Sequence, residues 1–449
     1  MRIPHPFLPP LNVAGLKLKQ TDKVIFLGDT AHEAAFRFYN LVWKFAIPLL
    51  RRNQRLAEGL GQRTLEHGIP PQSDLWIQAA SAGESYLAWS LLKNLRCPGP
   101  VRVLTTSNTR QGMDILEQIA VDVVSGNSVN TAYFPFDRPD IMAKAVRYVC
   151  PKIMVLLETE IWPGLLFALK KCNCKILIIN GRISEKSMRH YMLWPSFWRS
   201  LRPDRVLAVS PDDAERFSLL FGSNGIEVMR NMKFDGLDHA AQHGENPLEK
   251  MFPVHMPLLV LGSTGDEEEV AVEKIISQLR DRHPDVTICL FPRHMHRIRH
   301  WKKALVRLNI PWKLRSEISA PVQEPLLILW DTFGELSLAY ELASAAFVGG
   351  SLAPLGGQNF LEALSAGVIP VIGPSWESFH WVGREIMERG FVRIAGDWQE
   401  AAHMLSYQIR HPPSGERVRE AASEYIRKRQ GGTARACQVV AEFLSGCQS

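Results

Sequence analysis

Ala346-Phe-Val-Gly-Gly-Ser-Leu-Ala-Pro-Leu-Gly-Gly-Gln-Asn-Phe-Leu-Glu362 is the stretch that indicates the fold most directly. An apolar run typical of a buried strand ends at Gly349-Gly350, and Gly356-Gly357 then leads into Gln358 and a helix-like segment that carries Glu362. Glycine pairs after a strand let backbone N–H groups approach an anion closely, and a following helix N-terminus adds the positive end of its dipole. Because the spacing matches neither the dinucleotide fingerprint nor a Walker loop, these residues predict either a phosphate or sugar-nucleotide site or an ordinary tight strand-to-helix turn.

The same strand–helix pattern recurs through most of the chain. Repeated alternation of this kind predicts parallel, doubly wound sheets, as in Rossmann-like domains. The segments that we expect to be strands are Leu75–Ala80, Val101–Thr106, Lys152–Leu157, Lys175–Asn180 and Arg205–Val209 in the first half, and Pro257–Gly262, Val286–Phe291, Leu326–Trp330 and Val368–Ile372 in the second.

The alternation pauses near Gly225–Asn246 and then restarts, which predicts two successive α/β lobes. A connection of about 20 residues is longer than an ordinary loop and fits a hinge. The expected divisions are an N-terminal segment at 1–55, a first Rossmann-like domain at 56–230, a hinge at 231–250, a second Rossmann-like domain at 251–430 and a C-terminal helix at 431–449. Ligands of such sheets bind at the carboxyl ends of the strands, so we expect the site in the cleft between the lobes.

Composition is that of a globular protein. With 449 residues the chain is too long for one compact domain. Its 46% hydrophobic and 22% charged residues are ordinary, and the net charge of +6 weakly favours anionic partners or a membrane surface. Charges of both signs alternate along the chain, which argues against a nucleic-acid binder. The seven cysteines lack the spacing of a zinc site and predict reduced thiols, and Met1–Pro10 has no apolar core that would indicate a signal peptide.

The N-terminal part holds an apolar segment beside a basic cluster. Residues 1–35 read as irregular, and Phe36–Leu50 is followed by Arg51-Arg52 and Arg55. The segment is shorter than the roughly 20 residues that a spanning helix needs. Aromatic residues next to basic ones fit a helix in the membrane interface. A helix packed on its own domain fits equally well.

Polar residues at the predicted strand ends are the candidates for chemistry. Glu84 follows an apolar strand within a turn of small residues, so it is accessible as a proton acceptor, although a glutamate favoured by a helix dipole would look the same. Arg293 suits a phosphate through its donor fork, and Lys233 lies at the hinge; each is also compatible with plain surface exposure. No motif for metal or acyl-enzyme chemistry is present. The strand-end candidates are Glu84, Glu158, Ser263, Arg293, Glu335 and Glu362.

Together these residues resemble the Kdo transferases (3-deoxy-D-manno-octulosonic-acid transferases, glycosyltransferase family 30) from about Tyr39 to Leu405. One such motif would be weak, but eleven occur in order and at the family's spacing. They are Ala80-Ser-Ala-Gly-Glu84, Tyr133-Phe-Pro-Phe-Asp137, Glu158-Thr-Glu-Ile-Trp-Pro163, Asn180-Gly-Arg-Ile-Ser184 with Ser187 and Tyr191, Met232-Lys-Phe-Asp235, Gly262-Ser-Thr264, Pro292-Arg-His294, Gly334-Glu-Leu336, Phe347-Val-Gly-Gly-Ser-Leu352, Gly356-Gly-Gln-Asn359 and Glu362.

The resemblance implies a GT-B fold and an inverting transfer of Kdo from CMP-Kdo to a lipid A precursor, without metal or cofactor. It implies a peripheral protein at the cytoplasmic face of the bacterial inner membrane, with acceptor binding in the first lobe and CMP-sugar binding in the second. Glu84 matches the general base, and Glu158 and Lys233 match positions that stabilise the transition state. The CMP-binding segments match Pro292, Arg293, Phe333, Gly334, Glu335, Asn359, Phe360, Leu361 and Glu362, the last as ribose ligand. Additional cleft candidates are Ser263, Thr264, His294, Gly356, Gly357 and Gln358.

The chain also departs from the family pattern. Gln78, Gly265 and Gln358 stand where the family usually has histidine; Arg230 stands for glycine, Gly164 for asparagine, and Met295-His296 for Pro-Glu. These departures leave open a related CMP-2-keto-sugar transferase with a different acceptor. A catalytically silent GT-B scaffold is a further alternative, against which the joint presence of four charged candidates argues. A nucleotide-sugar 2-epimerase is weaker, because two of the motifs have no place there.

Overall fold

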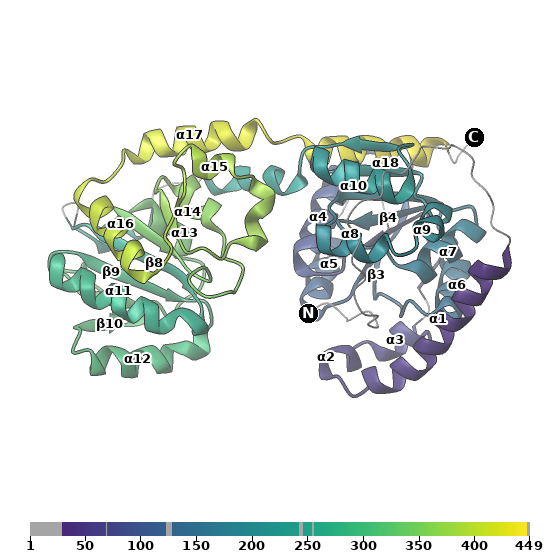
Figure 1. The fold of residues 1–449 in the computed structure, drawn as a ribbon. Coiled ribbons are helices and arrows are strands. Elements are labelled where there is room, and N and C mark those ends of the chain that lie inside the picture. The colour runs from purple at the N-terminus through teal and green to yellow at the C-terminus, as the bar shows by residue number, and fades with distance from the viewer. Residues whose placement is uncertain (1–28, 69, 123–127, 242–245, 254–255, 447–449) are drawn as a thin grey trace.

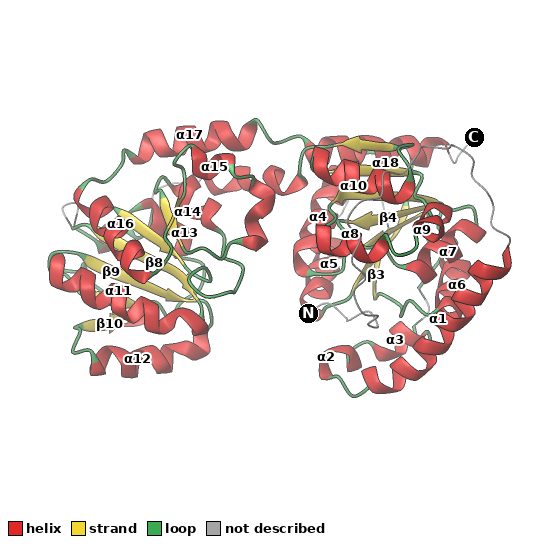
Figure 2. Ribbon diagram, in the orientation of Figure 1, coloured by secondary structure: helices red, strands yellow, loops and turns green. Residues whose placement is uncertain are grey.

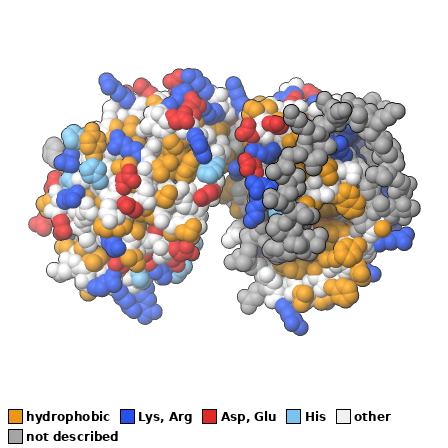
Figure 3. Space-filling model, viewed as in Figure 1, with side chains coloured by type: hydrophobic (Ala, Val, Ile, Leu, Met, Phe, Trp, Pro, Cys, Tyr) orange, Lys and Arg blue, Asp and Glu red, His pale blue; other side chains and the backbone are white. Residues whose placement is uncertain are grey.

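The computed structural model describes residues 29–68, 70–122, 128–241, 246–253 and 256–446. The chain forms two lobes, each built on one sheet of parallel strands with helices on both faces (Figures 1 and 2). This architecture confirms the predicted fold of two Rossmann-like lobes. Figure 3 shows the lobes meeting near the top of the molecule and separated by a notch below.

The N-terminal lobe holds a seven-stranded sheet among its described residues, in the order β3-β2-β1-β4-β5-β6-β7. Its strands are β1 (Leu75–Gln78), β2 (Arg102–Ser107), β3 (Ser128–Tyr133), β4 (Ile153–Leu157), β5 (Lys175–Gly181), β6 (Arg205–Ala208) and β7 (Ile226–Val228). Its helices are α1 (Asp29–Leu50), α2 (Gln54–Ala57), α3 (Leu60–Thr64), α4 (Ala82–Asn94), α5 (Arg110–Asp122), α6 (Pro139–Val149), α7 (Pro163–Lys171), α8 (Glu185–Tyr191), α9 (Pro195–Ser200) and α10 (Pro211–Phe221).

The C-terminal lobe repeats the design, with the described strands in the order β10-β11-β9-β8-β12-β13-β14. These are β8 (Leu258–Thr264), β9 (Thr287–Pro292), β10 (Trp312–Leu314), β11 (Leu327–Leu329), β12 (Ala345–Val348), β13 (Pro370–Ile372) and β14 (Arg393–Ile394). Its α-helices are α11 (Glu269–Arg282), α12 (Ile298–Arg307), α13 (Leu336–Glu341), α14 (Phe360–Ala366), α15 (Glu385–Glu388), α16 (Trp398–Arg410) and α17 (Gly415–Arg427), and α18 (Gly432–Gly446) follows them in the chain. Short 3-10 helices are η1 (Met232–Ala241), η2 (Glu249–Met251), η3 (Asp266–Glu268), η4 (Met295–Arg297), η5 (Arg315–Glu317) and η6 (Glu377–Val382).

Both faces of each sheet are buried, which explains why the central strands are continuous apolar runs. Along β4, Met154 and Leu156 enter one hydrophobic cluster while Val155 enters the cluster on the opposite face, and all three side chains are 0% exposed. Successive side chains of a strand point to opposite faces, so an unbroken apolar sequence is what a strand covered on both sides requires.

The chain crosses between the lobes twice, and the two crossings are tied together. The first runs through η1; the second lies between α17, on the C-terminal lobe, and α18, which returns to the N-terminal lobe (Figure 1). The Asp235 carboxylate of η1 accepts hydrogen bonds from the backbone N–H groups of Gly431 (2.6 Å) and Thr433 (2.5 Å) on the second crossing. The α18 residue Cys437 packs into the cluster of the N-terminal lobe and donates its thiol to the Leu91 carbonyl oxygen.

Two details differ from the sequence-based expectations. Helix α1 begins at Asp29, so residues 29–35 are helical rather than irregular, whereas residues 1–28 lie outside the described part. Four strands, β3, β7, β10 and β14, were not expected from the sequence. They are outer strands of the two sheets, where a continuous apolar run is not needed.

Candidate active site

Three neighbouring strands of the N-terminal sheet end in candidate catalytic residues. In the order β1-β4-β5, Glu84 lies in the first turn of the helix after β1, Glu158 follows β4 directly, and Arg182 follows β5. Because parallel strands end at one edge of a sheet, the structure brings these three positions to the same edge. This is the edge at which ligands of such sheets bind.

Glu84 is a nearly buried carboxylate with a strongly raised pKa. The residue is 8% exposed, and its Oε2 accepts hydrogen bonds from the Ser81 N–H (2.7 Å) and the Ser81 hydroxyl (2.9 Å). Burial, followed by the negative charges of Glu160 and Glu158, raises the pKa of Glu84 to about 8. These bonds also cap the start of α4, as expected for a glutamate that the helix dipole favours. A capping glutamate alone would keep an ordinary pKa, and a value near neutrality suits a general base.

Glu158 is paired with the hinge lysine. Its backbone adopts a left-handed conformation (φ 57°), which is uncommon outside glycine and is found at functional sites. Its Oε1 lies 2.6 Å from Nζ of Lys233. The Lys233 ammonium also lies over the ring of Trp381 from the C-terminal lobe, 5.8 Å from the ring centre. Lys233 therefore joins the carboxylate of one lobe to an aromatic ring of the other.

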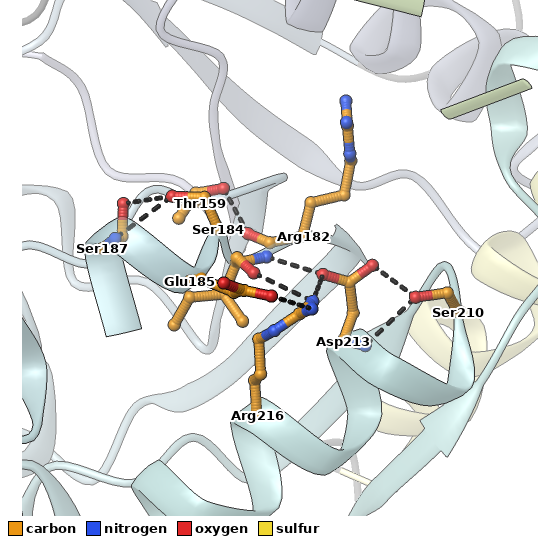
Figure 4. A network of polar contacts seen from close by, with 9 residues as sticks. Thr159, Arg182, Ser184, Glu185, Ser187, Ser210, Asp213 and Arg216 are labelled. Atoms are coloured by element: carbon orange, nitrogen blue, oxygen red, sulfur yellow. Dashed lines mark hydrogen bonds and ion pairs between the residues drawn. The ribbon is translucent and has the colours of Figure 1, made fainter. Parts of the chain in front are cut away.

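Arg182 is a candidate that the sequence analysis did not single out. The Thr159 hydroxyl donates to the Arg182 carbonyl oxygen, while Asp213 accepts from the Ile183 N–H (2.9 Å) and Arg216 donates to the Ile183 carbonyl oxygen (3.3 Å). Figure 4 shows this network fixing the loop while the Arg182 side chain extends away from it. Within the described residues the guanidinium has no hydrogen-bond or ion-pair partner, so a rigid loop presents a free cation. The position of Arg182 directly after a predicted strand was the signal that could have identified it.

The first glycine pair of the C-terminal lobe does not offer its N–H groups to a ligand. The buried carboxylate of Glu268 accepts hydrogen bonds from the N–H groups of Gly350, Ser351 (3.1 Å) and Leu352 (3.1 Å). The Gly265 N–H donates to the same carboxylate (2.8 Å). The predicted anion cradle exists, but an internal carboxylate fills it.

The second glycine pair is also committed within the protein. The Gly356 N–H donates to the Ser375 hydroxyl (2.9 Å), and the Gly357 N–H donates to the Gly350 carbonyl oxygen (2.7 Å). Both glycines have positive φ values of 85° and 82°, which explains the residue type. The donors left for an anion begin at Asn359, the exposed N-cap of α14, whose side chain makes no capping bond.

The CMP candidates divide into exposed and committed groups. Phe333 is 82% exposed, so its ring is open for stacking. The Glu335 carboxylate instead accepts bonds from Arg315 (2.8 Å), Trp330 (2.9 Å) and Thr332 (2.7 Å). Burial alone would raise the pKa of Glu335, but these bonds outweigh it and the pKa is lowered. Glu335 therefore stays ionised and holds its own loop in place.

The remaining candidates lie around the ends of β8, β9 and β12. Arg293 donates its N–H to the Thr264 carbonyl oxygen (2.9 Å) and leaves its side chain exposed, as is His294. Phe360 and Leu361 are 0% exposed, so only their backbone can meet a ligand. Burial raises the pKa of Glu362. Of the other candidates, Pro292 ends β9, Ser263 precedes the last residue of β8 (Thr264) and has φ 52°, Gly334 has φ 84°, and Gln358 packs against Gly350.

Comparison with known proteins shows a similarity to one family of transferases. The family model described as 3-Deoxy-D-manno-octulosonic-acid transferase (kdotransferase) matches residues 51–236. A 3-deoxy-D-manno-octulosonic acid transferase of Haemophilus influenzae is 26% identical over 400 residues, covering 88% of this chain and 92% of that relative. The transferase of Bordetella pertussis is 28% identical over 382 residues, covering 84% of this chain and 88% of its own. The chain is thus similar to Kdo transferases along most of its length.

The two-lobed fold has a counterpart among solved structures. A glycosyltransferase from Rickettsia africae superposes with a TM-score of 0.55 at 14% identity, covering 82% of this chain and 98% of that one. At this identity the likeness concerns the fold alone. It supports the assignment of the two lobes to GT-B.

Two departures of this chain from the Kdo transferase pattern have a structural explanation. The Gln78 side chain is fully buried, accepts from Thr106 (2.6 Å) and donates to Glu160 (3.3 Å), so the amide replaces an imidazole donor without adding a charge. A side chain at Gly164 would place its Cβ 2.6 Å from the Asp137 carbonyl oxygen, so glycine is required here.

Glu160 offers a test of the electrostatics around Glu84. Its negative charge is the second cause, after burial, of the raised pKa of Glu84. The E160Q change keeps an oxygen acceptor for the indole N–H of Trp162 but removes the charge. Because loss of this charge lowers the pKa of Glu84, we expect the ascending limb of the pH profile of kcat/KM to move to lower pH, by roughly one pH unit. A profile that stays in place would show that Glu84 does not govern this limb.

Proposed function

We propose that the protein transfers Kdo from CMP-Kdo to a hydroxyl group of a lipid A precursor, as part of lipopolysaccharide core biosynthesis. The observation that carries this proposal is that Glu84, with a pKa near 8, shares one sheet edge with the Glu158–Lys233 pair. Similarity to the Kdo transferases supports the reaction type, and the geometry supports the roles of the residues.

The reaction requires one proton transfer and one displacement. In the proposed mechanism the Glu84 carboxylate takes the proton of the acceptor hydroxyl, and the oxygen attacks the anomeric carbon of Kdo. The bond from this carbon to the CMP phosphate oxygen breaks, with inversion, and negative charge develops on the departing phosphate. Lys233, held by Glu158 at the junction of the lobes, is placed to stabilise that charge as it forms.

The C-terminal lobe is proposed to hold CMP. The exposed ring of Phe333 suits stacking on the base, and the exposed side chain of Arg293 suits the phosphate. Glu362, at the start of α14, is proposed as the ribose ligand. No step of this mechanism uses a metal ion. Among the described residues, no three His, Cys, Asp or Glu side chains gather as metal ligands do.

The acceptor is a lipid, and α1 offers a surface that fits one. Its described outer face carries Phe38, Leu41, Phe45 and Leu49, which are 50–70% exposed, and Arg51 follows the helix. In Figure 3 hydrophobic side chains gather over the lower part of the right-hand lobe, where Figure 1 places α1. None of the described helices combines the length and apolarity needed to cross a bilayer. We therefore propose peripheral binding at the cytoplasmic face of the inner membrane, through α1.

The testing experiment is a transfer assay with the purified full-length chain. CMP-Kdo is generated in situ and a tetra-acylated lipid A precursor is supplied in detergent micelles. We expect release of CMP in step with a product heavier by one or more Kdo residues, and unchanged rates in EDTA. No transfer together with no CMP binding by calorimetry would overturn the proposal and favour a non-catalytic scaffold. CMP release that requires another acceptor would favour the related transferase.

A further inference from the structure

An open apolar pocket lies beside α1, outside the residues assigned to catalysis. Its volume is about 490 Å³, within the range of small-molecule sites and many times that of one water molecule. Helices α1, α7 and the α9 region build it from segments far apart in the sequence. Its lining is aromatic except for one proline: Phe36, Phe38, Tyr39, Pro163, Trp194, Phe197 and Trp198.

The pocket wall is fixed by a buried carboxylate. The Tyr39 hydroxyl donates to Asp137 (3.0 Å), which also accepts from the N–H groups of Gly164 (2.9 Å) and Leu165 (2.7 Å). Burial raises the pKa of Asp137 to about 7 even though these bonds oppose the shift. Because the Tyr39 hydroxyl is bonded to Asp137, it is not available to a ligand, and the Tyr39 ring lines the pocket.

The same loop forms the pocket wall and part of the active site. Pro163, which lines the pocket, lies five residues after Glu158, and Glu160 between them accepts from the indole of Trp162 (2.7 Å). Five residues span at most about 18 Å. One short loop thus links the pocket to Glu158 and Glu160, whose charges act on Glu84.

The mouth of the pocket lies on the surface that fits a membrane. Phe38 (68% exposed) and Trp194 (41% exposed) belong both to the pocket and to the surface, and the neighbouring Leu193 is 75% exposed. Exposed basic residues, Lys171 and Arg199, lie in the last turns of two of the pocket helices, α7 and α9. An apolar interior with a basic surround complements a molecule with a hydrocarbon tail and an anionic head.

We propose that this pocket binds one fatty acyl chain of the lipid acceptor while the sugar of that acceptor reaches Glu84. The inference rests on the proposed function and adds a second contact for the same substrate. Each methylene of a hydrocarbon chain that leaves water favours binding, so a chain seated in the pocket would hold the acceptor with its sugar near Glu84.

The kinetic test compares two exposed phenylalanines of α1. Phe38 lines the pocket, whereas Phe45, 70% exposed and two turns along the same face, does not. In micelles containing the tetra-acylated acceptor we expect F38D to lower kcat/KM at least tenfold below F45D. With a deacylated, water-soluble acceptor the ratio between the two variants should fall to about one. Equal losses of kcat/KM in F38D and F45D with the acylated acceptor would show that both side chains act only through general membrane contact, and would overturn the proposal.

A binding test separates failure of the pocket from failure of the proposed reaction. Quenching of Trp194 fluorescence by an acceptor with a brominated acyl chain is measured as the difference between the unaltered chain and W194F. We expect quenching in the unaltered chain and in F45D, with at least a tenfold weaker affinity in F38D. Quenching without any sugar transfer would retain the pocket and reject the reaction. Absence of quenching would overturn the proposal. So would equal quenching by vesicles of brominated phosphatidylcholine, if adding unlabelled acceptor did not relieve it.

Discussion

Replacement of Glu84 by glutamine should lower kcat by about 10³-fold, the middle of the range that general acid–base catalysis supplies. The amide cannot accept the proton of the acceptor hydroxyl at any pH. Its oxygen can still accept from the Ser81 N–H and hydroxyl, so the start of α4 should remain folded. The measurement is the single-turnover rate of sugar transfer, together with CMP affinity by calorimetry, which should change little. An E84Q variant within threefold of the unaltered rate would remove Glu84 from the mechanism.

The matched control for E84Q is S81A. Both Ser81 hydrogen bonds lower the pKa of Glu84, and S81A removes the one from the hydroxyl. The base should therefore remain active but titrate at higher pH, so activity should recover at pH values above the normal ascending limb.

The thermal stability of E84Q should exceed that of the unaltered chain at high pH. The pKa of Glu84 is raised from 4.5 to about 8 on folding, so its contribution is fully present below pH 4.5 and is lost as the pH rises toward 8. At pH 8 and above, E84Q should melt at a higher temperature than the unaltered chain.

Replacement of Lys233 by methionine should have the second-largest effect, a loss of roughly 10²–10³ in kcat, as for removal of one preorganised donor to a developing charge. The ammonium is held 2.6 Å from Glu158 and close to Trp381, so its position is set before substrate binds. Because the stabilised charge forms only in the transition state, affinity for CMP should change a few-fold at most. K233R, which keeps the charge, should retain more activity than K233M.

K233M also leaves the Glu158 carboxylate without its cation, which can destabilise the fold. The double variant E158Q/K233M removes both charges and should recover the thermal stability without recovering kcat. A double variant with normal kcat would contradict the proposed role of the lysine. Recovery of stability with kcat still low would separate the catalytic role from the structural one.

The sequence was sufficient to predict the two sheets, because central parallel strands need unbroken apolar runs. It did not identify β3 (Ser128–Tyr133), since only its last two residues are buried and the rest is polar or partly exposed. Glu84 could be found because it follows its strand at once. The occupant of the glycine cradle could not, because Glu268 lies far earlier in the sequence and resembles an ordinary acidic helix start. The apolar pocket was hidden for the same reason, as α1 and α9 meet only in the folded chain.

The return of α18 to the first lobe has a consequence for biosynthesis. Domains commonly fold one after another as they leave the ribosome, the N-terminal one first. Here Ala436, Val439 and Val440, among the last described residues, complete a hydrophobic cluster that begins with β1. Until α18 has been synthesised, the nascent first lobe presents an open apolar surface against α4. We therefore expect that lobe to stay bound by a ribosome-associated chaperone until α18 can pack on it, and an early stop before Gly432 to yield aggregated protein rather than a free domain.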